Sequence, residues 1–211
     1  MKDFVTATIQ AIGKCATRLP EVQDSCLHGL MSLLSNRSEF VVAESIVSIK
    51  GLLQIGGGED TKIVTHLSKL LSTITLPNAR ASIVWMVGEY SKKIPTVAPD
   101  VLRVLCQSFR KEDKLVKLQV VNLAAKLLLF NYNVEVIQLM FQYICNLAKF
   151  DLSYDVRDRA RVFRSILLSN ACPNLKQNAE ALFFAEKTAP TTLSLEGKSY
   201  FHYFYFILSP Y

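Results

Sequence analysis

Apolar helical segments that recur along the chain constrain its fold more than any other feature. Between Asp3 and Phe184, apolar residues are spaced three and four apart in segments of about 12 to 18 residues. Short runs containing Pro, Gly, Asn or Asp separate these segments, as at Pro20, Pro77 and Pro95. Residues three and four apart share one face of a helix, so the spacing predicts about ten helices and no strand.

Four of these segments are apolar on nearly every side: residues 41–53, 79–90, 115–130 and 156–168. They begin about 37 to 41 residues apart, which is the interval expected of HEAT or armadillo repeats. The first two also match locally, since Ser45 and Gly51 recur as Ser82 and Gly88, 37 positions later. The chain therefore contains an internal repeat.

A single helical hairpin cannot bury so wide an apolar surface, so each hairpin needs the hairpins on either side of it. The sequence therefore predicts an all-α fold, a HEAT/armadillo-like α-solenoid of stacked helical hairpins. The nearly all-apolar helices form its inner layer. Amphipathic segments such as residues 61–73 form an outer layer, with one face packed and the other in water.

One inner helix, residues 115–130, leaves only a narrow polar stripe of Gln119, Asn122 and Lys126. These residues stand at i, i+3 and i+7, so we expect the stripe to face solvent or a partner along one surface. Trp85 lies within another of the apolar helices. We expect it in the core rather than exposed as a binding hot spot.

The helical spacing ends near Lys187, which divides the chain into a solenoid over residues 1–187 and a linker with an atypical tail over residues 188–211. The last part, residues 199–211, has no charge and is crowded with Tyr and Phe. It is too short to span a bilayer, and it has the character of an exposed strand or sticky tail. A truncation or an alternative reading frame would produce such an end.

Composition narrows the classes of function. The net charge is +6, but Lys and Arg are interspersed with acids along the chain, unlike the dense basic regions of nucleic-acid-binding modules. Five cysteines form an odd set without close pairing, and no secretory signal opens the chain, so a reducing cytosol is expected. Lys or Arg interrupts every long apolar segment, which argues against a membrane span.

Candidate catalytic motifs are incomplete. Residues 56–58 are three glycines, but Lys62 stands four positions further on and no strand is predicted before them, so they form an inter-helix loop rather than a phosphate-binding loop. Cys26 and His28 point about 200° apart on a helix, and no metal-ligand spacing is present. The sequence predicts no catalytic, cofactor-binding or metal-binding residue.

The one basic cluster, Arg157, Arg161 and Arg164, flanks an apolar stripe on one helix. It could anchor an acidic partner or a lipid headgroup, or it could pair with acids inside the fold. The second interpretation is favoured, because pairs of Asp155 with Arg159 and of Asp158 with Arg161 would neutralise much of the field.

A series of ordered strings runs along the chain, at residues 2–5, 12–16, 33–37, 41–45, 79–83, 88–90, 98–103, 116–120, 122–127 and 154–161. Together they resemble the trunk of the beta-adaptins, most of all the beta subunit of adaptor-protein complex three. The similarity runs in register from about Lys2 to Pro190. The chain does not match the family beyond Lys198.

This resemblance implies a scaffold fragment of a vesicle-coat adaptor, without enzymatic activity or a cofactor. By the same resemblance, the trunk would hold the medium subunit and pair with a second large subunit, on the cytoplasmic side of Golgi, endosome or coated-vesicle membranes. The complex would sort cargo toward lysosomes and related organelles. The chain lacks the family's hinge and ear, so clathrin binding is not implied. The alternatives are another helical-repeat protein such as a nuclear transport receptor, or an enzyme that uses Cys26, His28 or the glycine loop.

Overall fold

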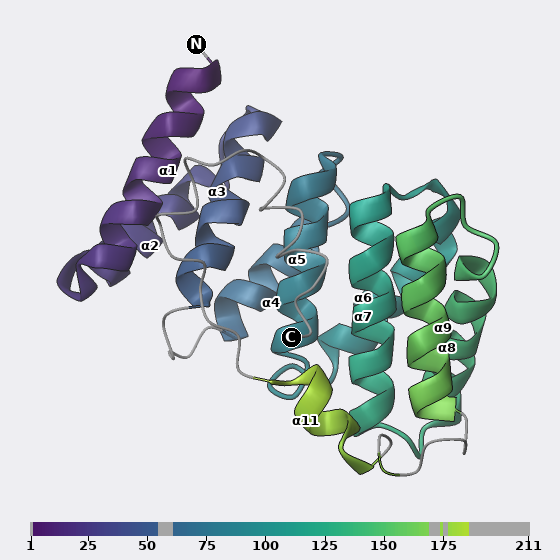
Figure 1. Ribbon diagram of the computed structural model, residues 1–211. Coiled ribbons are helices and arrows are strands. Elements are labelled where there is room, and N and C mark those ends of the chain that lie inside the picture. Colours follow the sequence, from purple (N-terminus) through teal and green to yellow (C-terminus); the bar gives the residue numbers. More distant parts are fainter. Residues whose placement is uncertain (1, 55–60, 169–173, 175–176, 186–211) are drawn as a thin grey trace.

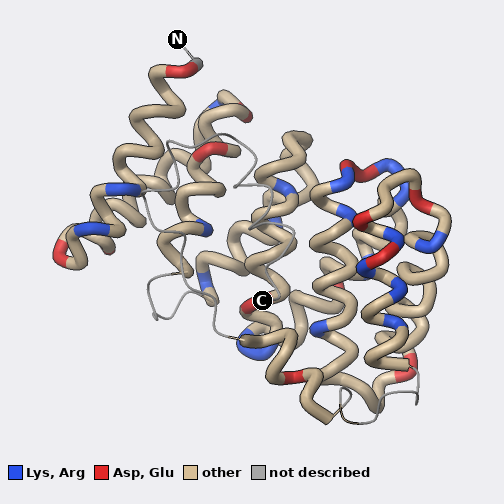
Figure 2. Tube along the Cα trace, viewed as in Figure 1, with Lys and Arg blue, Asp and Glu red and all other residues tan. Residues whose placement is uncertain are grey.

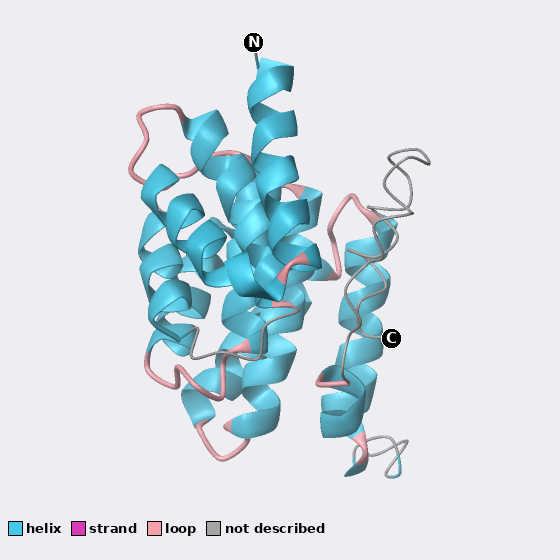
Figure 3. Cartoon of the chain, turned by 90° about the vertical axis from the view of Figure 1, so that its left-hand side faces the viewer, coloured by secondary structure: helices cyan, strands magenta, loops and turns pink. Residues whose placement is uncertain are grey.

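The computed structural model describes residues 2–54, 61–168, 174 and 177–185. The predicted glycine loop at residues 56–58 and the predicted tail at residues 188–211 lie outside the described residues. Throughout the described ranges the regular structure is helical, and no strand occurs in them (Figure 3). The prediction of an all-α fold is confirmed.

Ten α-helices and two short 3₁₀ helices occur in the described part of the chain. The α-helices are α1 (Lys2–Arg18), α2 (Gln23–Leu33), α3 (Glu39–Leu53), α4 (Thr61–Leu70), α5 (Pro77–Glu89), α6 (Val97–Ser108), α7 (Lys114–Phe130), α8 (Glu135–Ala148), α9 (Tyr154–Leu168) and α11 (Ala179–Phe183). The 3₁₀ helices are η1 (Pro20–Val22) and η2 (Phe109–Lys111).

The helices form two layers of a solenoid (Figure 1). In the inner layer α1, α3, α5, α7 and α9 follow one another, and each contacts the next. In the outer layer α4, α6 and α8 contact one another in the same order, while α2 packs on α1 and α3. Each hairpin is therefore closed by its neighbours, as the repeat in the sequence predicts.

Burial distinguishes the inner helices α3, α5 and α7, which lie between two others, from the outer helices. In α7 13 of 17 residues are buried, whereas in α4 only Val64, Leu67 and Ser68 are buried among 10 residues. An inner helix that lies between two others, such as α7, meets both neighbours and its outer partners, so it must be apolar nearly all round. In α9 only Val156, Ala160, Phe163 and Leu167 are buried among 15 residues, so the prediction that residues 156–168 are apolar on nearly every side is wrong. An outer helix keeps a polar face in water.

Contacts between neighbouring repeats recur at the length of the repeat. The Tyr90 hydroxyl donates to the Leu53 carbonyl oxygen at 3.2 Å, and these residues are 37 positions apart. At the other end of the same two helices, α3 and α5, the Glu39 carboxylate accepts from the backbone N–H groups of Thr75 and Leu76 at 2.5 and 3.2 Å. Equivalent positions of successive repeats lie side by side, so the 37-residue period in the sequence is the stacking period of the solenoid.

Arg80 makes hydrogen bonds to two of the connections between helices. The guanidinium of Arg80, on α5, donates to both oxygens of the Glu112 carboxylate, at 3.0 and 2.5 Å. It also donates to the carbonyl oxygens of Leu71 and Ile74, at 2.6 and 2.9 Å. Arg80 therefore joins the end of the α4 hairpin to the turn before α7, where Asp113 caps the helix through the Leu115 N–H at 2.9 Å.

The last described helix returns to the inner layer. The Phe183 ring of α11 lies 4.7 Å from that of Phe163 on α9, and the Phe184 ring lies 4.5 Å from that of Phe130 on α7. Lys92, just after α5, pairs with Glu180 at 2.6 Å. Separately, no helix in the described ranges combines the length and apolarity that crossing a bilayer requires.

Candidate functional site on the inner helices and the last hairpin

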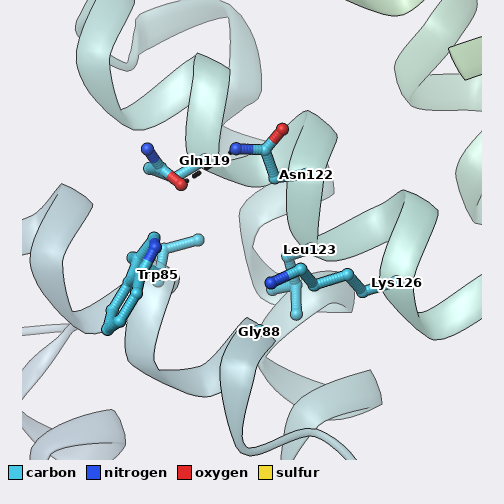
Figure 4. A pocket seen from close by; sticks show the side chains of 7 residues that line it. Trp85, Gly88, Gln119, Asn122, Leu123 and Lys126 are labelled. Carbon is cyan, nitrogen blue, oxygen red and sulfur yellow. Dashed lines mark hydrogen bonds between the residues drawn. The ribbon is translucent and has the colours of Figure 1, made fainter. Parts of the chain in front are cut away.

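Polar side chains of three consecutive inner helices meet on one side of the inner layer. Trp85 on α5, Asn122 on α7 and Arg159 on α9 stand at successive 37-residue intervals. Figure 4 shows Trp85 and Gly88 facing Gln119, Asn122 and Lys126 across the junction of α5 and α7. The repeat brings these positions together, because each takes the same place in its own hairpin.

Hydrogen bonds connect these side chains across the helices. The Asn122 amide donates to Oε1 of Gln119 at 3.1 Å, and its oxygen accepts from the Arg159 guanidinium at 3.3 Å. Nζ of Lys126 pairs with the Glu89 carboxylate on α5 at 2.6 Å. The contacts of Asn122 with Arg159 and of Lys126 with Glu89 again join residues 37 positions apart. They hold α5, α7 and α9 in register.

The prediction that this stripe faces solvent is wrong. Gln119, Asn122 and Lys126 are only 2%, 9% and 5% exposed. They tolerate burial because each has a partner of the right chemistry: Gln119 and Asn122 bond to each other within α7, and the neighbouring repeats supply a guanidinium and a carboxylate. Contact with a partner remains a prediction.

The pocket between α5 and α7 is small. It is lined by the residues of Figure 4 together with Val84, and its volume of about 10 Å³ would hold about one water molecule. Pockets for small-molecule substrates are typically about 300 to 1,000 Å³. In addition, no group of three potential metal-binding side chains occurs among the described residues. The junction of α5 and α7 is therefore suited to holding helices in register rather than to binding a substrate.

Arg159 on α9 joins this network through Asn122, whereas the sequence predicted it only as a partner of Asp155. Burial lowers the pKa of its guanidinium to about 10, although Asp155 raises it. The guanidinium is still charged at neutral pH. The interval of 37 residues between Asn122 and Arg159 could have predicted their contact. Because an amide and a guanidinium are different in type, the two positions do not look like a repeat in the sequence.

The predicted arginine cluster is mostly engaged within the protein. Arg161 pairs with Asp158 at 2.8 Å, as predicted. The predicted pair of Asp155 with Arg159 is replaced, because the Asp155 carboxylate pairs with Lys114 of α7 at 2.5 Å. Arg157 donates to the Asp151 carbonyl oxygen at 2.8 Å, and Arg164 reaches the side chain of Asn146 on α8 at 3.4 Å.

Two further predictions concern individual residues. Trp85 is 8% exposed, which confirms its place in the core, and Nζ of Lys50 lies 4.9 Å from the centre of its ring. On α2, Cys26 is half-buried and His28 is exposed, so the two side chains have different environments on the helix.

Most of the large apolar side chains that are exposed lie on the last hairpin, formed by α8 and α9, or on the connections beside it. Of the 13 large apolar side chains exposed in the described part of the chain, nine lie between Tyr132 and Val162. On α8, Val136, Leu139 and Tyr143 form a stripe at i, i+3 and i+7. Apolar surface gathered in this way marks an interaction site more often than scattered residues do. The sequence pattern did not predict this stripe, although α8 has a single charged residue, Glu135, in 14 positions.

Comparisons with known proteins agree with this architecture. The family model described as the adaptin N terminal region matches residues 1–171. The chain is 53% identical over 190 residues to AP-3 complex subunit beta-2 of Mus musculus and 51% identical to AP-3 complex subunit beta-1 of Homo sapiens. Each alignment covers 90% of this chain and 17% of the relative. AP-3 complex subunit beta of Dictyostelium discoideum is 39% identical, with 92% and 22% covered. The chain thus spans less than a quarter of the length of these relatives.

Proposed function

The chain belongs to the family of the adaptin N-terminal region, and from this we propose that it is a scaffold fragment of the large beta subunit of a vesicle-coat adaptor complex. In this role it supports intracellular protein transport and cargo sorting toward lysosomes and related organelles. It binds other proteins and catalyses no reaction. The observation that carries the proposal is the family match over the same residues that form the stacked hairpins.

The proposed partners are the medium subunit and the second large subunit of the complex. A solenoid offers each of them a long surface with many weak polar contacts and a few buried anchors. The stripe of Val136, Leu139 and Tyr143 on α8 supplies apolar anchors of this kind. Assembly would place the chain peripherally on Golgi, endosome or coated-vesicle membranes.

We further propose that residues 1–187 act as the trunk unit and that residues 188–211 are dispensable for assembly. The family match ends at residue 171, well before the aromatic tail. Co-expression with a tagged medium subunit tests both statements, using the full chain and a version cut after Pro190. Recovery of both forms with the medium subunit is the expected result.

A stripe variant, Val136→Asp with Leu139→Asp, should lower this recovery. The matched control is Lys62→Asp with Lys69→Asp on α4, an outer helix on which no large apolar side chain is exposed. If neither form of the chain is recovered while far-ultraviolet circular dichroism shows it to be helical, the adaptor assignment fails.

A further inference from the structure

The connection between α8 and α9 presents three large apolar side chains to solvent. Phe150, Leu152 and Tyr154 are 80%, 95% and 76% exposed. They alternate with less exposed residues along residues 149–154, which we call the tip loop. Single exposed apolar residues are common, but three at this level within five positions need an explanation.

The tip loop is held in place from inside by Asp151. Its carboxylate accepts from the Ser153 backbone N–H at 2.9 Å and pairs with Lys117 of α7 at 2.7 Å. Its carbonyl oxygen accepts from Arg157 at 2.8 Å. Asp151 is thus anchored to the solenoid while its neighbours Phe150 and Leu152 point outward. Presentation of the apolar side chains is therefore preorganised.

Cations lie beside two of these apolar side chains. Nζ of Lys149 lies 5.3 Å from the centre of the Phe150 ring, and the Arg157 guanidinium lies 4.3 Å from that of Tyr154. Arg110 and Lys111 are exposed on η2, which contacts α8. Figure 2 shows charged residues gathered at this end of the last hairpins.

Positive charge predominates at this edge. Residues 109–117 and 149–157 contain six Lys or Arg and four Asp or Glu. All four acids are already engaged: Glu112 with Arg80, Asp113 as a helix cap, Asp151 with Lys117 and Asp155 with Lys114. Among the described residues, Arg110, Lys111 and Lys149 have no ion-pair partner. They remain available to an anionic surface.

We infer that the tip loop inserts Phe150, Leu152 and Tyr154 into the headgroup region of an anionic lipid bilayer, with the flanking Lys and Arg side chains against the lipid phosphates. Aromatic side chains favour the membrane interface, and each cation close to an anionic surface adds to the attraction. A stable protein interface needs about 800 Å² from each partner, which is more than three side chains of a short loop provide. A bilayer imposes no such minimum.

The α8 stripe lacks this character, since Val136, Leu139 and Tyr143 have only the acidic Glu135 beside them on the helix. It therefore serves as the matched control. The inference adds a direct lipid contact to the membrane association in the proposed function. Purified vesicles contain no other subunit, so the lipid contact and adaptor assembly can succeed or fail independently.

The test is co-sedimentation of the 211-residue chain with phosphatidylcholine vesicles that contain phosphatidylserine. Phe150→Ser with Leu152→Ser should lower the partition coefficient at least about tenfold, and Arg110→Gln with Lys111→Gln should lower it by several-fold. Val136→Ser with Leu139→Ser should leave it unchanged. Binding should also fall with added salt and in vesicles of phosphatidylcholine alone.

A second readout locates the contact. Leu152→Trp should give fluorescence that brominated lipids quench, whereas the buried Trp85 of the unaltered chain should not respond. Absence of quenching at position 152, or equal sedimentation of the Phe150/Leu152 variant and the unaltered chain, overturns the inference. The inference is also overturned if Phe150→Ser with Leu152→Ser abolishes recovery with the medium subunit but leaves vesicle binding unchanged. The tip loop would then be a protein contact.

Discussion

Removal of the Arg80 guanidinium should destabilise the solenoid far more than removal of a charge in an exposed ion pair. We consider Arg80→Met, which keeps a similar unbranched stem but removes every donor. In the native protein this guanidinium makes two contacts with Glu112 and two with backbone carbonyl oxygens. The substitution leaves a carboxylate without its counter-ion and two carbonyl groups without this donor.

The magnitude follows from the burial of the pair. The side chains of Arg80 and Glu112 are only 16% and 8% exposed, so water does little to compensate the loss. Removing one partner of a buried ion pair costs about 3 to 5 kcal/mol. The remaining exposure and the hydrogen bond from Ser108 to Glu112 at 2.8 Å soften the effect. We expect a loss of about 3 kcal/mol in the free energy of unfolding.

The assay is urea denaturation followed by far-ultraviolet circular dichroism, with Arg103→Met as the control. Arg103 pairs with Asp100 at 2.7 Å, but both side chains are more than 60% exposed, so its removal should cost less than about 1 kcal/mol. The double variant Arg80→Met with Glu112→Leu should recover part of the loss, because the isolated charge is gone. Equal costs for Arg80→Met and Arg103→Met would refute the reasoning.

Three further outcomes test other parts of the structure. Phe141→Ala, at a fully buried position of α8, should cost about 3 to 5 kcal/mol by the same assay, and a loss below about 1 kcal/mol would contradict the packing. Burial raises the pKa of Asp151, but hydrogen bonds and nearby cations outweigh it and hold the pKa below its ordinary value. The ionised Asp151 carboxylate therefore contributes its full stabilisation at neutral pH, and this contribution is lost as the pH falls through the lowered native pKa. Asp151→Asn should weaken the dependence of the unfolding free energy on pH in this acid range. Burial raises the pKa of Cys106 and Cys145 to about 11. Iodoacetamide at pH 8 should therefore modify the exposed Cys15 before Cys106 and Cys145, as measured by peptide mass spectrometry. Equal rates of modification would count against the burial of Cys106 and Cys145.

Local spacing was enough to predict the helices and the order in which they stack. The apolar pattern of residues 115–130 matches α7 to within a residue, and the break at Asn131 falls directly after it. The inner helix predicted at residues 79–90 begins two residues earlier, because Pro77 is the first residue of α5 rather than part of the loop before it. The match of Ser45 with Ser82, 37 positions later, also predicted the interval at which the repeats stack.

The fate of individual polar groups was not predictable in this way. Gln119, Asn122 and Lys126 form a polar stripe in sequence, but the neighbouring repeats bury them. Asp155 lies four residues from Arg159, yet it pairs with Lys114, which stacking brings closer. The exposure of Phe150 and Leu152 likewise depends on Asp151 being held by Lys117 of another helix.

The sequence by itself thus determined the helices, their apolar faces and the repeat, because these depend on residues three or four apart and on one recurring interval. Tertiary structure alone decided which polar groups are buried and paired and which apolar groups remain in water. The physical reason is that solvation and ion pairing depend on every group within a few ångströms, and stacking supplies most of those groups from about 37 residues away.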